Sequence, residues 1–223
     1  MPPDRRIALP LVAVPFVLQL VVLAVLGLVL RPPRGADGIY SIRFGVVVLC
    51  SYAALAGATV VIANRHGDPR TILALRRMPV RRTTAIVAAT FAVAVVASLL
   101  LEPIFHGVRA QGFDPGAFPG GASSTAGLAI AFLGVAVAAP VAEELYFRGL
   151  LQGSLERFGP PVAVGTTAAL FATVHFVPAA IPVLAVYGVL LGLIRSRTHS
   201  VIPGIIAHAL NNSVALVAAV ALT

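Results

Sequence analysis

Long apolar segments follow one another along the chain, and they restrict its fold more than any other feature. Three of them, residues 7–30, 44–62 and 83–101, contain no charged side chain at all. A helix of about 20 residues crosses the hydrocarbon core of a bilayer, whereas the core of a signal peptide is about 7–15 residues long. We therefore expect residues 7–30 to be a retained membrane helix rather than a cleaved leader.

The composition extends this interpretation to the whole chain. Of 223 residues, 59% are hydrophobic and only 11% are charged, which is too apolar for the surface of a soluble domain. Further apolar segments end at turn residues or arginines. The sequence thus predicts an all-α, polytopic transmembrane bundle of about seven spans in a single integral membrane domain, 1–223, with the later spans at residues 124–158, 162–177, 183–194 and 201–222.

The basic residues indicate a membrane rather than a nucleic-acid partner. The net charge is +8 and all sixteen basic residues are arginine, but they lie between the apolar segments. Such positions suit contacts with lipid headgroups and set topology, so we expect no nucleic acid and a cytoplasmic N-terminus. Exclusive use of arginine suits a GC-rich bacterium and its plasma membrane. The loop between the apolar segments 44–62 and 83–101 is rich in arginine. Within it, residues 71–75 fit a short interfacial helix or a solvated loop equally well.

Two adjacent carboxylates, Glu143 and Glu144, interrupt an apolar run, and two histidines follow in later apolar segments. A charge at membrane depth costs about 2.5–3.5 kcal/mol on insertion scales, so it is kept where it is paired or functional. Glu143 and His175 lie equally far from the turn at Gly159, which gives them equal depth in a helical hairpin. His208 reaches the same layer from the next cytoplasmic turn. We expect an active site in the cytoplasmic half of the membrane.

Three short motifs order these residues. Glu144 and Arg148 are four residues apart, on one helix face, and can form a supporting ion pair. The same spacing joins Phe171 to His175 and His208 to Asn212. In this order, on successive apolar helices, the motifs resemble the CPBP (Abi) family of CAAX-protease and bacteriocin-processing intramembrane proteases, which includes the type II CAAX prenyl-protein endopeptidases.

The resemblance implies a catalytic core at residues 123–223, preceded by helices and loops at 1–122. It implies that Glu143 is the catalytic carboxylate and that His175 joins it in activating water. His208 and Asn212 would bind water or stabilise the oxyanion, and Phe171 is expected to pack beneath the motif. The expected activity is an intramembrane endopeptidase acting on a peptide or protein, with a prenylated or otherwise lipidated substrate as one family option.

The chemistry of these residue types leaves the cofactor open. A carboxylate can act as base toward water, but one carboxylate and two histidines, here Glu143, His175 and His208, can also hold one zinc ion. The sequence does not separate a metal-bound from a glutamate-bound water. Buried Glu and His also relay protons, so a proton-coupled transporter is an alternative, as is a non-catalytic immunity or scaffold protein.

Overall fold

The computed structural model describes residues 7–32, 41–106 and 125–221, and every regular element in these ranges is helical. This confirms the all-α prediction. The N-terminal part consists of α1 (Leu9–Leu30), α3 (Ile42–His66), the short α4 (Pro69–Ile72) and α5 (Val80–Phe105). These bounds differ from the predicted ones by only a few residues.

One long helical rod follows, and its winding changes along its length. It comprises α7 (Thr125–Phe132), η2 (Leu133–Ala138), α8 (Ala139–Glu143), η3 (Glu144–Leu151), α9 (Gln152–Leu155) and η4 (Glu156–Phe158). The segments η2 and η3 are π-helical, and η4 is a 3₁₀ turn. At Gly159 the backbone turns with φ of 95°, which glycine adopts without strain, and two prolines then start the next helix.

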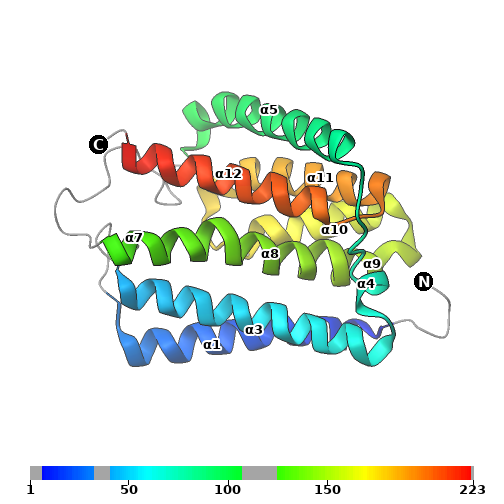
Figure 1. The fold of residues 1–223 in the computed structure, drawn as a ribbon, viewed down its shortest axis with the longest axis horizontal. Coiled ribbons are helices and arrows are strands. Elements are labelled where there is room, and N and C mark those ends of the chain that lie inside the picture. Colours follow the sequence, from blue (N-terminus) through cyan, green and yellow to red (C-terminus); the bar gives the residue numbers. More distant parts are fainter. Residues whose placement is uncertain (1–6, 33–40, 107–124, 222–223) are drawn as a thin grey trace.

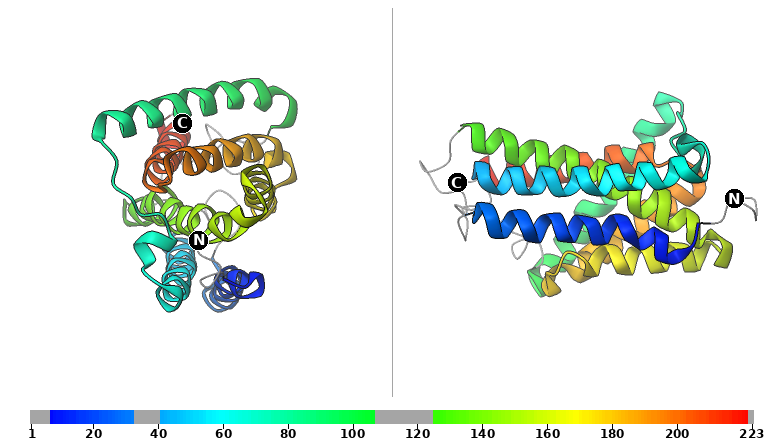
Figure 2. Two further views of the ribbon diagram at one scale, coloured as in Figure 1. Left: turned by 90° about the vertical axis from the view of Figure 1, so that its right-hand side faces the viewer. Right: turned by 90° about the horizontal axis from the view of Figure 1, so that it is seen from below.

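The last part of the chain forms α10 (Pro160–Thr173), the 3₁₀ turn η5 (Pro178–Ala180), α11 (Ile181–Thr198) and α12 (Ile202–Ala221). Figure 1 shows the long rod in the middle of the molecule, with α1 and α3 packed on one side of it. On the other side α5 lies across α11 and α12, and the left view of Figure 2 shows the same order. The rod is thus the element that joins the N-terminal helix pair to the rest.

Within the described ranges, five helices are long and apolar enough to cross a membrane: Leu9–Leu30, Ile42–His66, Val80–Phe105, Thr125–Phe158 and Pro178–Thr198. The seven predicted spans all appear as helices, but α10 has 14 residues and is about 21 Å long, short of a hydrocarbon core of about 30 Å. The predicted count of seven spans is therefore not confirmed. Large apolar side chains face outward from the bundle, such as Leu28 and Leu99, as lipid contact requires.

Within residues 71–75 the short helix α4 ends at Ile72, and Ile72, Leu73 and Ala74 are buried, so this segment is not a solvated loop. Leu73 is completely buried, and Gly149 lies so close that a Cβ there would stand 3.2 Å from the Leu73 Cα. The Ala74 carbonyl accepts a hydrogen bond of 3.0 Å from the backbone of Val201. Residues 72–74 are therefore part of the protein interior, because they pack closely against the rod at Gly149. No local sequence pattern predicts this contact.

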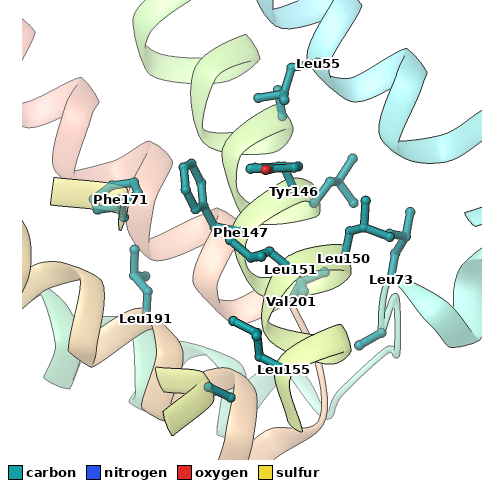
Figure 3. Close-up of a cluster of buried hydrophobic side chains, with 14 of the residues drawn as sticks. Leu55, Leu73, Tyr146, Phe147, Leu150, Leu151, Leu155, Phe171, Leu191 and Val201 are labelled. Carbon is teal, nitrogen blue, oxygen red and sulfur yellow. The ribbon is translucent and has the colours of Figure 1, made fainter. Parts of the chain in front are cut away.

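A cluster of buried side chains packs around the rod below the acidic pair. Figure 3 shows Phe147 between Phe171 of α10 and Tyr146, with Leu150 and Leu73 further along the rod. Phe147 and Phe171 meet edge to face with ring centroids 5.5 Å apart. This packing fixes the rotation of the rod, and with it the direction of the polar side chains just before it in the sequence.

Candidate active site

Glu143 stands at the junction of the rod's α8 and its second π-helical segment. In a regular α-helix, neighbouring side chains point about 100° apart, so one of two adjacent carboxylates commonly faces outward. Here both are buried, with Glu143 6% and Glu144 0% exposed. The π-helical segments η2 and η3 flank this point, and π-helical turns are frequent at functional sites.

The Glu143 carboxylate has a different partner at each oxygen. Its Oε1 accepts a hydrogen bond of 2.7 Å from the Tyr52 hydroxyl of α3. Its Oε2 lies 3.8 Å from His208 Nε2, beyond direct hydrogen-bond reach. At this separation one water oxygen placed to the side can lie about 2.8 Å from both atoms. The carboxylate is thus held at one oxygen and open at the other.

Glu144 holds the imidazole from its other side. Its Oε1 lies 3.0 Å from Arg148 NH1 and 3.2 Å from His208 Nδ1. A carboxylate only accepts hydrogen bonds, so Nδ1 of His208 carries the proton and Nε2 turns toward Glu143. The ion pair that the sequence predicts as a support therefore also sets the tautomer of His208.

Arg148 is fully buried inside the bundle. Its NH2 donates to the Gly188 carbonyl at 3.2 Å, and its guanidinium carbon lies 4.4 Å from the centre of the Phe171 ring. From the sequence, Arg148 was counted among the arginines that lie between apolar segments and set topology. That prediction is wrong for Arg148, because its side chain lies inside the bundle and not in a cytoplasmic loop. The charge is instead compensated by Glu144 and by the face of an aromatic ring.

The predicted span at residues 162–177 placed His175 within a helix. In the structure α10 ends at Thr173, so His175 lies in the turn beyond it. Its Nδ1 lies 2.7 Å from the Phe171 carbonyl, so this nitrogen is the donor and Nε2 keeps its lone pair. The Phe171 ring meets both imidazoles edge to face, with centroids 4.9 Å from His175 and 5.7 Å from His208. One phenylalanine thus spaces the two histidines.

Asn212 follows His208 by one turn of α12 and points toward the rod. Its Nδ2 donates to the carbonyl of Val135, in the π-helical segment η2, at 3.0 Å. This bond ties α12 to the rod and leaves the second amide hydrogen for another acceptor.

These side chains share one cavity of about 960 Å³, which Tyr52, Glu143, His175, His208 and Asn212 all line. Tyr187 and Asn211 also line it, whereas Tyr146 does not. Much of the remaining wall is apolar and comes from α3, α5 and α12. The predicted acid, imidazoles and amide therefore face one space, although they come from separate helices.

The side chains that could hold a metal ion are already engaged or lie apart. Among the residues that the structure describes, no three His, Cys, Asp or Glu side chains are grouped so as to hold one ion. Glu143 and His175 each already use one polar atom for a protein hydrogen bond. The zinc option at Glu143, His175 and His208 stays a prediction, and we derive no step through a metal.

Residues 125–214 match the family model described as type II CAAX prenyl endopeptidase Rce1-like. This segment belongs to the Rce1-like CAAX protease family. No curated protein and no solved structure matches the chain. The five apolar helices and the similarity of this segment to a membrane protease family support an integral membrane protein. All three motifs fall inside the Rce1-like segment, whereas α3 and α5 lie outside it.

Sequence reasoning missed one residue of this site, Tyr52. It belongs to no motif and lies 91 residues before Glu143 in the chain. Its only local sign is a polar hydroxyl within a span without charges, shared with Ser51 and Thr59 beside it. That sign does not say which helix the hydroxyl meets.

Proposed function

We propose that the chain is an intramembrane endopeptidase in which Glu143 activates a water molecule against a peptide carbonyl. The observation that carries this proposal is a chain of contacts that runs from Glu143 through His208 and Glu144 to Arg148. In it, an oriented imidazole faces an open carboxylate oxygen across 3.8 Å in a cavity within the bundle. A poorly hydrated carboxylate that is free at one oxygen suits general-base catalysis.

In the proposed hydrolysis Glu143 accepts one proton and later returns it. A water held at Glu143 Oε2 gives one proton to the carboxylate while its oxygen bonds to the carbonyl carbon. The C–N bond then breaks, and the proton from Glu143 passes to the leaving nitrogen. The unprotonated Nε2 of His175 or His208 accepts a hydrogen bond from the water's other O–H, which orients the lone pair that attacks.

The negative charge that develops on the carbonyl oxygen needs hydrogen-bond donors. The second amide hydrogen of Asn212 is one candidate. The Tyr187 hydroxyl is another, because it lines the cavity, is buried, and has no protein partner among the described residues. The ring of Tyr187 meets His208 edge to face at 5.5 Å, so this tyrosine lies beside the imidazole.

The largely apolar wall suits a peptide with an apolar or lipidated end, and a prenylated CAAX-type peptide is the substrate class we propose to try first. We place the N-terminus in the cytoplasm of a bacterium and the site in the cytoplasmic half of its plasma membrane. The family match favours neither the transporter nor the non-catalytic alternative.

The test is cleavage of farnesylated CAAX-type peptides by the purified full chain in nanodiscs, followed by mass spectrometry. We expect Glu143→Gln to lower kcat at least about 100-fold, the lower range for a general base. Glu156→Gln is the matched control, since it makes the same change at a half-exposed carboxylate outside the cavity. Equal activity of wild type and Glu143→Gln would refute the assignment.

A further inference from the structure

The hydroxyl of Tyr52 contacts the acidic pair from outside the Rce1-like segment. It donates to Glu143 Oε1 at 2.7 Å, a length typical of a hydrogen bond to a charged carboxylate. Tyr52 lies on α3, and the family match begins only at residue 125. The contact is therefore a property of this chain that the family motifs do not contain.

Close helix packing brings α3 within reach of Glu143. One face of α3 is buried through Ser51, Leu55 and Thr59, which are spaced four residues apart. One turn before Tyr52, Val48 lies against Gly134 of η2, where a Cβ would stand 3.0 Å from the Val48 Cγ1 atom. The missing side chain lets α3 approach the rod, and the Tyr52 hydroxyl then reaches the carboxylate.

The hydrogen bond fixes the orientation of the Glu143 carboxylate, with one oxygen bound and the other free. Without it, the carboxyl group can rotate about its last side-chain bond, whose torsion is broad and roughly two-fold. Only with Oε1 held by Tyr52 does Oε2 stay directed at His208 Nε2. A buried oxygen that loses its donor costs about 1–3 kcal/mol, so the carboxylate would turn toward another partner.

We propose that Tyr52 is a positioning residue for the reaction: it holds Glu143 so that one oxygen faces the attacking water. This inference rests on the proposed function. It makes α3, outside the matched segment, a part of the active site. Tyr52 itself touches neither water nor the peptide carbonyl in this role.

The test replaces only the hydroxyl, with Tyr52→Phe in the full chain. We expect kcat to fall by about 10- to 100-fold with KM within about twofold, the pattern of an interaction that matters in the transition state and not in ground-state binding. Tyr146→Phe is the matched control. It removes a hydroxyl from a buried tyrosine of the rod that does not line the cavity, and it should cleave like wild type.

Infrared difference spectra give a readout that does not depend on cleavage. The carboxylate band that disappears in Glu143→Gln should shift in Tyr52→Phe and stay in place in Tyr146→Phe. An unshifted band, or a Tyr52→Phe protein that cleaves like wild type, overturns the role of Tyr52 while the proposed function stands. A Tyr52→Phe protein that no longer folds also overturns it, because the hydroxyl is then structural. If wild type itself does not cleave, the proposed function has failed, and the role of Tyr52 in it fails with it.

Discussion

Replacing Glu144 by glutamine is expected to destabilise the protein strongly, whereas the same change at Glu143 is not. Arg148 is completely buried, and Glu144 is its acidic partner among the described residues, at 3.0 Å. Glu144→Gln keeps the volume but leaves the guanidinium uncompensated. Removing one partner of a buried ion pair costs about 3–5 kcal/mol. That is a large part of a typical total stability of about 5–15 kcal/mol.

Glu143 differs because its held oxygen has a neutral donor. A glutamine oxygen accepts the Tyr52 hydrogen bond as well as a carboxylate oxygen does, so only the charged part of that bond is lost. Hydrogen bonds to charged groups contribute about 1.5–3 kcal/mol and neutral ones about 0.5–1.5, so we expect Glu143→Gln to cost about 1 kcal/mol. The two isosteric changes should therefore differ by about 2–4 kcal/mol, the difference between the two estimates.

Unfolding in mixed micelles with increasing SDS, followed by circular dichroism, measures this difference. Both variants should lose cleavage, so activity alone does not separate them. The double change Glu144→Leu with Arg148→Met removes both charges and should recover most of the stability without recovering cleavage. Equal stability of Glu144→Gln and Glu143→Gln would show that the buried arginine does not depend on Glu144, and would refute the electrostatic reasoning.

Three further outcomes follow from the geometry. Gly204→Ala places a Cβ 2.9 Å from Glu144 Oε2, and since that carboxylate is held by two partners we expect kcat to fall at least about 10-fold; wild-type activity would contradict the claim that Glu144 orients His208. The proposed step, in which Glu143 itself takes a proton from water, needs no metal, so cleavage should continue in EDTA or phenanthroline; loss of cleavage that zinc restores would contradict this step and favour the zinc option at Glu143, His175 and His208. The Thr71 hydrogen bonds keep the pKa of Asp68 below its usual value, so the helix cap at Asp68 is present above the ordinary Asp pKa and is lost as pH falls through the lowered one. The protection of the Thr71 amide from hydrogen exchange, measured relative to the intrinsic rate at each pH, should then fall only in that acidic range, and a loss of protection near neutral pH would contradict the assignment.

The sequence predicts where helices lie but not how they face one another. Apolar runs and turn residues located the helices closely, and intramembrane polar groups marked the site at Glu143, His175 and His208. In a membrane protein, however, lipid-facing and buried faces are both apolar, so periodicity does not reveal which helices pack together. The contact of α3 with the rod, and with it Tyr52, follows from a close approach at Gly134 that only the structure shows.

Local departures from regular helix were equally invisible. The π-helical segments η2 and η3 were not predicted, and neither was the burial of both carboxylates, which follows from helices packed on opposite sides of the rod. The burial of Leu73 likewise depends on a groove at Gly149, far along the chain. Motif spacing predicted the ion pair of Glu144 with Arg148, but not that the same carboxylate reaches His208 across 64 residues.

Cleavage in H₂¹⁸O tests the central claim most directly. With the full chain in nanodiscs and a farnesylated peptide, the new carboxyl terminus of the product should carry one ¹⁸O, and Glu143→Gln should form at least about 100-fold less of it. An intact peptide with wild type, or equal labelled product with Glu143→Gln, would contradict the account that Glu143 activates water within the membrane.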